Sequence, residues 1–187
     1  MGNLVKWRDK RRTAKENKAL CRRYPFLIPW HRFTGQVYAK CNDRGKMVAI
    51  PQYDWSYTEL DDMPDGWRQA FGIQLCEEIR NDLIEHDDLD RWKIVQMKEK
   101  YGRLEIYDNG HVIGSKVFDI IEKYGDLSER TCICCGKPAT RMALGWISPY
   151  CDNCCPEFGA MPIEEYFKED ETDDRADGSY REDGEVH

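Results

Sequence analysis

Residues 129–158 read ERTCICCGKPATRMALGWISPYCDNCCPEF and contain six of the nine cysteines of this 187-residue chain. Cys132 and Cys135 form one CxxC pair, and Cys151 and Cys154 form a second pair fifteen residues later. A CxxC turn directs two thiolates at one centre, so two such turns can complete a tetrahedral metal site. In a reducing compartment, close pairs of this kind are more often metal ligands than disulfides. The spacing therefore predicts that these four cysteines bind one zinc ion.

Two further cysteines, Cys134 and Cys155, stand next to predicted ligands and leave an alternative register in which one of them binds the metal. Because neighbouring residues in an extended turn point in different directions, six thiols cannot all reach one ion. The CxxC-Gly-x-Pro pattern favours Cys132 and Cys135 in the first pair. Four thiolates close the coordination sphere, whereas a catalytic zinc keeps one position open for water. We therefore predict a structural zinc. Outside this region, we expect Cys21, Cys41 and Cys76 to be small buried hydrophobes.

The composition is that of a folded globular protein, with 41% hydrophobic and 12% aromatic residues. No run approaches the roughly 18 apolar residues of a membrane-spanning helix. The basic N-terminus, MGNLVKWRDKRRTAK, lacks the apolar segment of a secretory signal. We therefore expect a cytosolic protein with no membrane association.

Charge is distributed unevenly along the chain. Residues 1–32 carry a net charge of +8, whereas residues 152–187 carry −10, and the whole chain carries −7. Almost no apolar residue follows Phe167, which predicts a disordered tail. These shifts in charge and composition predict four segments: a basic N-terminal arm (1–23), an α+β core (24–128), a zinc-knuckle module with four cysteine ligands (129–158) and an acidic, largely disordered tail (159–187).

Periodicity predicts the elements of the core. Apolar residues recur at helical spacing after Asp65, which can cap the helix. They are Trp67, Ala70, Phe71, Leu75, Ile79, Leu83 and Ile84. The run WKIVQMKEKYGRLEIYDNG predicts a hairpin that reverses near Gly102, with a short third strand at 111–113. Ser115 can cap a second helix, SKVFDIIEKYGDLSER.

The predicted fold is therefore of the α+β class, with two helices packed on a small antiparallel sheet and a C-terminal module resembling a zinc ribbon. The stretch around Pro25 and Pro29 is predicted to be extended, because the residue before a proline is biased away from the helical region.

No catalytic group is recognisable in the sequence. One histidine follows an Asp-Asn-Gly turn, as in an HNH nuclease, but the next predicted helix lacks the second histidine and the asparagine of that family. The sequence contains no glycine-rich phosphate loop, serine nucleophile motif or HExxH. We therefore expect a protein that is not an enzyme. The four histidines are His31, His86, His111 and His187.

Three runs, ELDDMPDGWRQAFGIQLCEEI, WKIVQMKEKYGRLEIYDNG and TCICCGKPATRMALGWISPYCDNC, carry a resemblance to a protein family. Over roughly residues 20–156, the chain resembles small uncharacterised proteins of bacterial phages and prophages. The most specific parts are the KEKYG-x-L hairpin and the paired CxxC knuckles with Gly145-Trp146 between them. The resemblance implies a location in the cytoplasm of a bacterial host. By analogy of gene context, it implies an antagonist of bacterial defence, such as a Cas9-inhibiting anti-CRISPR protein.

The first function hypothesis is that the chain binds and inhibits a host protein that handles nucleic acid, such as a defence nuclease. The acidic surface would compete with nucleic acid for a basic groove on that protein. The predicted contact residues are Trp55, Tyr57, Asp61, Asp62, Asp65 and Trp67, of which Trp67 can instead belong to the core.

The alternative hypothesis is a zinc-ribbon-type protein that binds nucleic acid through its basic N-terminal arm. Cationic side chains would neutralise phosphates, and aromatic rings would stack on bases. The net charge of −7 argues against it, because nucleic-acid-binding domains usually carry a positive field. The predicted contacts are Lys6, Arg8, Lys10, Arg11, Arg12, Lys15, Lys18, Arg22 and Arg23, with Trp7, Tyr24 and Trp30 for stacking.

Overall fold

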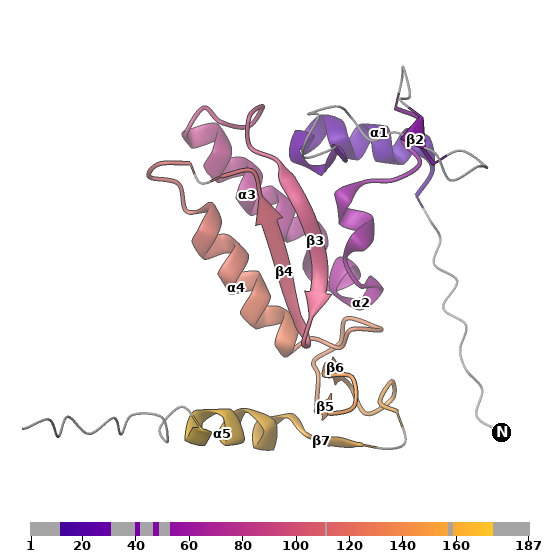
Figure 1. Cartoon of the computed structure of the whole chain (residues 1–187), viewed down its shortest axis with the longest axis vertical. Helices are drawn as coiled ribbons and strands as arrows, with labels where there is room; N and C mark the ends of the chain where they lie inside the picture. Colours follow the sequence, from indigo (N-terminus) through magenta and orange to yellow (C-terminus); the bar gives the residue numbers. More distant parts are fainter. Residues whose placement is uncertain are drawn as a thin grey trace, which may run out of the picture.

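The fold combines helices with small antiparallel sheets (Figure 1). The computed structural model describes residues 12–30, 40–41, 47–48, 53–110, 112–156 and 159–173. Two long helices lie beside a two-stranded hairpin, and a three-stranded sheet follows in the C-terminal part. The core elements are α3 (Ile73–Glu85), β3 (Ile94–Lys100), β4 (Arg103–Asp108) and α4 (Val117–Glu129). The predicted α+β class, with two helices and a hairpin, is therefore confirmed.

The first long helix starts close to the predicted point, but Asp65 is its first residue rather than its cap, which is Pro64, and the helix is interrupted by a π-helical turn. The short α2 (Asp65–Trp67) leads into η3 (Arg68–Gly72), and α3 continues from there. A π turn holds one more residue than an α turn and shifts the residues that face the core. Of the last two residues of the predicted apolar stripe, Leu83 is buried, whereas Ile84 is 47% exposed. Ala70 of the same stripe is also exposed.

The hairpin of β3 and β4 reverses through a two-residue turn, Tyr101–Gly102. Both turn residues have positive φ, +52° and +81° respectively, as a type I′ turn requires. The pairing runs from Lys100↔Arg103 at the tip and contains an irregularity between Ile94 and Gln96. The predicted third strand is not observed for residues 112–113, and residue 111 lies outside the described residues.

The start of the second long helix, α4, is closed by Ser115, as predicted, together with a side chain from α3, although the N-cap position itself is Lys116. Both carboxylate oxygens of Asp82 lie 3.1 Å from the backbone N of Lys116, which donates to them. The hydroxyl of Ser115 donates to Asp82 at 2.6 Å and accepts from the backbone N of Val117 at 3.0 Å. A buried carboxylate therefore ties the two helices together at the start of α4.

The described part of the predicted N-terminal arm belongs to the core. Residues 14–23 form a helix whose N-terminus is closed by a capping box between Thr13 and Glu16. Asn17 and Cys21 on this helix are buried. A 3₁₀ turn follows at residues 25–27, so the extended structure expected there is not observed. The N-terminal elements are α1 (Ala14–Arg23), η1 (Pro25–Leu27), β1 (Lys40–Cys41), β2 (Met47–Val48) and η2 (Glu59–Asp62).

The C-terminal part is a small sheet followed by a helix. Its strands are ordered β6-β5-β7, and all pairs are antiparallel. The helix contradicts the disorder predicted after Phe167 as far as residue 173, and residues 174–187 lie outside the described residues. The guanidinium of Arg130 lies 4.4 Å from the centre of the Phe167 ring. Within the described ranges, no helix is both long enough and apolar enough to cross a membrane. These elements are β5 (Arg141–Ala143), β6 (Ser148–Tyr150), β7 (Ala160–Pro162) and α5 (Ile163–Asp173).

Candidate metal centre

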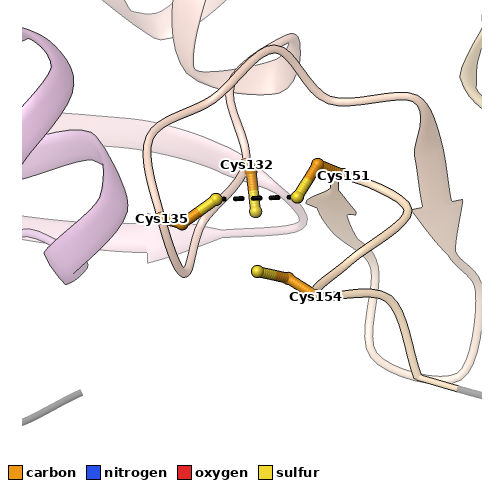
Figure 2. Close-up of side chains that lie close together, drawn as sticks. All are labelled: Cys132, Cys135, Cys151 and Cys154. Atoms are coloured by element: carbon orange, nitrogen blue, oxygen red, sulfur yellow. Dashed lines mark hydrogen bonds between the residues drawn. The ribbon is translucent and has the colours of Figure 1, made fainter. Parts of the chain in front are cut away.

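The four predicted ligands Cys132, Cys135, Cys151 and Cys154 point at one centre (Figure 2). Their Sγ atoms all lie within 4.8 Å of one another, and those of Cys135 and Cys151 are 3.5 Å apart. At a metal–sulfur distance of about 2.3 Å, a tetrahedron has sulfur–sulfur edges of about 3.8 Å. The cluster therefore has the size and the donor set of a four-thiolate metal site.

The electrostatics of the cluster favour a bound cation. Burial and the contacts with Cys135 and Cys151 raise the pKa of Cys154. Burial also opposes ionisation of Cys151, but hydrogen bonds from Cys135 and Cys154 outweigh it and lower the pKa of Cys151. One thiolate is thus stabilised by protonated neighbours. Four thiolates this close can coexist only with a positive ion between them, which replaces the thiol protons.

Backbone hydrogen bonds shape both knuckles. The N–H of Gly136 donates to the carbonyl of Cys132 at 2.9 Å, and Gly136 itself has a φ of +73° that suits glycine. In the second knuckle, the N–H of Cys154 donates to the carbonyl of Cys151 at 3.0 Å. The two knuckles are joined because the N–H of Ile133 donates to the carbonyl of Pro149 at 2.9 Å. The local backbone therefore holds the thiols in place.

The two neighbouring cysteines do not belong to the cluster. Cys134 is exposed, and among the described residues the group of converging donors contains neither Cys134 nor Cys155. The register with Cys132, Cys135, Cys151 and Cys154 is the one that the geometry favours. Two other cysteines, Cys21 and Cys76, are buried in the core as expected. The side chain of Cys41 lies outside the described residues.

The first knuckle is pressed against the start of the long helix. The N–H of Gly66 donates to the carbonyl of Ile133 at 2.9 Å, and the indole N–H of Trp67 donates to the carbonyl of Thr131 at 2.8 Å. A Cβ atom on Gly66 would lie only 2.3 Å from the carbonyl oxygen of Cys132. One on Gly136 would lie 2.6 Å from the carbonyl oxygen of Gly66. We call this contact of residues 131–136 with residues 65–70 the seam.

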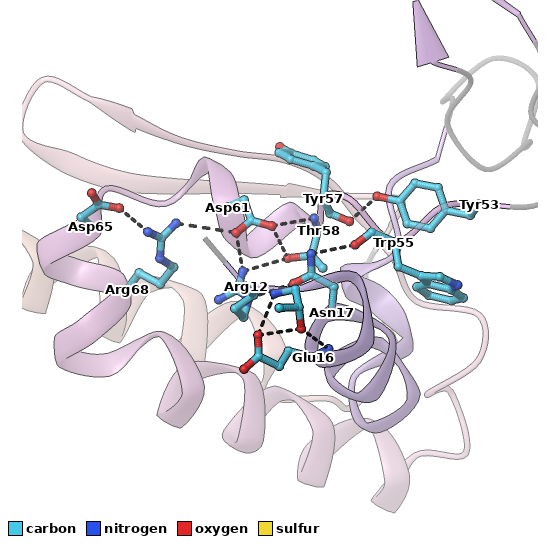
Figure 3. Close-up of polar contacts among 11 residues, drawn as sticks. Arg12, Glu16, Asn17, Tyr53, Trp55, Tyr57, Thr58, Asp61, Asp65 and Arg68 are labelled. Carbon is cyan, nitrogen blue, oxygen red and sulfur yellow. Dashed lines mark hydrogen bonds and ion pairs between the residues drawn. The ribbon is translucent and has the colours of Figure 1, made fainter. Parts of the chain in front are cut away.

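The residues predicted to contact a protein partner mostly serve the fold (Figure 3). Trp67 is fully buried, so its predicted alternative place in the core is the correct one. Asp61 is paired with Arg12, and Asp65 is paired with Arg68. Both carboxylates therefore neutralise arginines that are themselves largely buried, although the Asp65 side chain is still 45% exposed.

Most of the remaining predicted partner contacts are also engaged by other residues of the protein. The carbonyl of Trp55 accepts from the side chain of Asn17 at 2.8 Å, and the Trp55 ring is half-buried. Burial and a hydrogen bond to Asp62 raise the pKa of Tyr57. Beside them, burial raises the pKa of Glu59 to about 8, so this carboxyl is largely protonated in the folded protein at neutral pH. Only Asp62 of this set is exposed.

The predicted nucleic-acid contacts divide into two groups. Arg12 donates to Asn17, Thr58 and Asp61, and Arg23 donates to Glu77. Both are therefore engaged by other side chains. Arg23 is nevertheless exposed, as are three further cations of α1: Lys15, Lys18 and Arg22. The predicted contacts Lys6, Arg8, Lys10 and Arg11 lie outside the described residues, as does Trp7.

The predicted stacking rings do not form an open platform. The Tyr24 ring is buried, and its hydroxyl donates to Glu77 at 2.8 Å. Trp30 is half-buried, and its indole N–H donates to the carbonyl of Ile94 at 2.8 Å. Of the histidines, the structure describes His86, whose Nδ1 lies 2.8 Å from the carbonyl oxygen of Asp82 at the end of α3. His86 thus closes a helix.

Two exposed aromatic residues lie at a second meeting point of the metal module and the core. Tyr101 at the hairpin tip is 73% exposed, and Trp146 in the turn between β5 and β6 is 75% exposed. Together with their neighbours they line a cavity of about 360 Å³. No prediction from the sequence covers this surface, since Gly145 and Trp146 stand out there only as the residues between the two CxxC pairs.

No family model, curated protein or solved structure matches the chain. The resemblance to phage proteins that the sequence suggests therefore stays a hypothesis. The inference of function rests on the chain's own residues.

Proposed function

We propose that the chain is a non-enzymatic binding protein whose fold is completed by one structural zinc ion. Zinc is the ion that tetrahedral sites of four cysteines most often hold. All four coordination positions would be filled by Cys132, Cys135, Cys151 and Cys154, so no position remains for a substrate or a reactive water. The ion would lock the module to the core at the seam.

The single observation that carries the binding role is the exposure of Tyr101 and Trp146 on this scaffold. Tryptophan and tyrosine are the side chains most enriched among the residues that dominate protein–protein binding energy. An indole that is three-quarters exposed gains nothing for the fold, since its apolar area stays in water. Its exposure is consistent with a role in binding.

The proposed partner is a basic host protein that handles nucleic acid, such as a defence nuclease in the bacterial cytoplasm. The net charge of −7 supports this class, because an acidic surface is attracted to the positive groove of such a protein. The engagement of Arg12 and Arg23 by acidic side chains argues in the same direction, since it removes two predicted phosphate contacts.

The test is DNA cleavage by purified RNA-guided and restriction nucleases in the presence of the zinc-loaded chain. We expect slower cleavage by at least one of these nucleases, with no binding of the chain to the DNA alone at physiological salt. Tight binding to DNA with no effect on any nuclease would reject the proposal and favour the nucleic-acid hypothesis. The matched control is the same titration with a variant of equal net charge, Trp146→Ala.

A further inference from the structure

The cavity between Tyr101 and Trp146 is built from two turns that belong to different parts of the molecule. One is the tip of the β3–β4 hairpin in the core, and the other is the turn between β5 and β6 in the metal module. Leu144, 49% exposed, adds an aliphatic side chain beside the two rings. We call this surface the two-turn groove, and its lining residues are Glu99, Lys100, Tyr101, Leu144, Gly145, Trp146 and Ile147.

The backbone at the hairpin tip carries a residue that the turn itself does not favour. Tyr101 has a φ of +52°, and the first position of a type I′ turn prefers Asn, Asp or Gly. A large side chain in this left-handed conformation is strained and occurs mostly where function requires it. Because Tyr101 is 73% exposed, little burial compensates for the strain. The strained and exposed ring points to a contact outside the chain.

The metal module holds the second turn against the first. A Cβ atom placed on Gly102 would lie 3.4 Å from Ile147 and 3.5 Å from Pro149, so β6 packs directly on the hairpin tip. Pro149 in turn accepts the hydrogen bond from Ile133 in the first knuckle. The shape of the two-turn groove therefore depends on the metal cluster, which fixes the knuckles relative to each other.

The lining of the two-turn groove carries one anion, Glu99, and one cation, Lys100, whose Nζ lies 5.8 Å from the centre of the Tyr101 ring, and an acidic cluster follows beside the hairpin tip. Arg103, the cross-strand neighbour of Lys100, is surrounded by three carboxylates of α4. These are Glu122, Asp126 and Glu129, and the Asp126 side chain is 74% exposed. One guanidinium cannot balance three carboxylates, so this cluster keeps a net charge of −2. Four thiolates around a divalent ion would carry a further −2 in the metal module.

We propose that the two-turn groove binds a linear segment of a partner protein that has one large apolar side chain flanked by lysine or arginine residues. The apolar side chain enters the hollow between Tyr101 and Trp146, whose volume of about 360 Å³ suits one or two side chains. The flanking cations face the carboxylates of α4. This inference rests on the proposed function, namely that the chain binds a protein.

Two other occupants fit the surface less well. Single-stranded nucleic acid would stack on the rings, but its phosphates would face Glu99 and the carboxylate cluster around Arg103. A second copy of the chain would bring the same acidic cluster against itself, and both copies carry −7. A basic peptide is the occupant for which both the apolar hollow and the charge are complementary.

The test is selection from a displayed library of random peptides on the immobilised, zinc-loaded full chain. We expect enrichment of peptides with a Trp, Phe, Leu or Met flanked by Lys or Arg. For a synthetic peptide of that sequence, Trp146→Ala and Tyr101→Ala should each raise Kd by about tenfold or more. Removing the metal with a strong chelator should abolish binding.

The matched control is Phe118→Ala, which removes another exposed aromatic side chain at the far end of β4. It should change Kd by less than about twofold. Equal metal content of all variants excludes a folding defect. Failure to enrich any peptide, or Kd values unaffected by Trp146→Ala, would overturn the proposal. So would tighter binding of a single-stranded oligonucleotide, or a dimer in sedimentation that Trp146→Ala dissociates.

The two proposals fail in different ways. If a nuclease is inhibited and Trp146→Ala inhibits it equally well, inhibition of a nuclease stands as the function, but neither the exposed Trp146 ring nor the two-turn groove is responsible for it. If basic peptides bind the groove but no nuclease is affected, the groove stands and the class of partner is wrong. Running the peptide titration and the cleavage assay on the same variants separates these results.

Discussion

The metal module meets the core in two places that differ in almost every physical respect. At the seam, glycine backbones touch, and Gly66 and Gly136 leave no room for a Cβ atom. At the two-turn groove, the hairpin tip packs on Ile147 and Pro149 with room for a Cβ atom, and Tyr101 and Trp146 remain in water beside a cavity. The seam buries Trp67 and satisfies its indole N–H, whereas the groove exposes Trp146.

This difference separates what holds the protein together from what is available to a partner. A contact so close that only glycine fits allows one arrangement of the two parts, so it specifies how the metal module docks on the core. A contact that leaves large rings exposed adds little to stability, and a protein that needed stability alone would fill it with smaller or polar residues. Substitutions at the seam should therefore change stability, and substitutions at the groove should change binding.

The largest effect should follow loss of a cluster cysteine. Cys135→Ser or Cys151→Ser removes one of four ligands, and structural zinc contributes roughly 10 kcal/mol or more of folding free energy. We expect loss of the bound metal, about one ion per chain in the parent protein, and a cooperative loss of structure in the module. Metal analysis by mass spectrometry and thermal unfolding measure the two effects.

The neighbouring cysteines provide the control for this prediction. Cys134→Ser and Cys155→Ser should keep the metal, because neither Sγ belongs to the converging group. If either variant loses the metal while Cys132→Ser keeps it, the ligand assignment is wrong. Iron rather than zinc in the purified protein would contradict the proposed identity of the ion.

A smaller but still large effect is expected from Gly66→Ala at the seam. The new Cβ atom would meet backbone atoms of Cys132 and Ile133 that cannot rotate away, so the knuckle has to move. Overpacking of this kind costs about 1–3 kcal/mol of unfolding free energy, or more where backbone shifts are needed. Denaturant unfolding and competition with a zinc chelator should both show the loss.

Gly145→Ala is the matched substitution at the groove. A Cβ atom there would meet nothing within 4 Å, so the free energy of unfolding should change by less than about 0.5 kcal/mol. Equal destabilisation by the two alanines would mean that the seam is no tighter than the groove, and the comparison would fail.

The next largest loss of stability is expected from Arg12→Ala. This variant tests whether Arg12 stabilises the fold or binds phosphates. Its side chain is 24% exposed and donates to Asp61, Thr58 and Asn17. Removing it leaves the Asp61 carboxylate with only the more distant Arg68, at 3.7 Å, as a cation and leaves Asn17 and Thr58 without their donor, which should cost about 1–3 kcal/mol in chemical unfolding. Lys15→Ala, at an exposed position of the same helix, should cost less than about 0.5 kcal/mol. If Lys15→Ala had the larger effect, and if that effect were on DNA binding alone and not on stability, the nucleic-acid hypothesis would be restored.

Local patterns in the sequence predicted the elements well, because each depends on neighbours along the chain. The CxxC spacing brought the four thiols together, and the KEKYG run predicted the reversal at Gly102. Long-range contacts were not predictable in this way. The pairing of Arg12 with Asp61 joins residues 49 apart, so Arg12 looked like part of a free basic arm. The seam between Gly66 and the first knuckle is equally remote in sequence.

Exposure was the other feature that the sequence could not reveal. Trp67 and Trp146 are both tryptophans beside glycine, yet one is fully buried and the other is 75% exposed. Their environments depend on which parts of the fold meet, and no spacing rule encodes this. The helix α5 was missed for a related reason, since a charged segment with few apolar residues can still fold where a ring such as Phe167 meets Arg130.

The smallest expected effect on stability is an increase, whereas the other variants lose stability. Tyr101→Asn places a residue that tolerates positive φ at the first position of the type I′ turn, where the tyrosine is strained. Because the Tyr101 ring is 73% exposed, little packing is lost. The variant should therefore gain up to about 1 kcal/mol in chemical unfolding while its Kd for a selected basic peptide rises about tenfold. Trp146→Ala should lose binding equally with no gain in stability, since its turn carries no such strain. A Tyr101→Asn variant that is both less stable and fully competent in binding would show that the ring supports the fold, and it would remove Tyr101 from the two-turn groove.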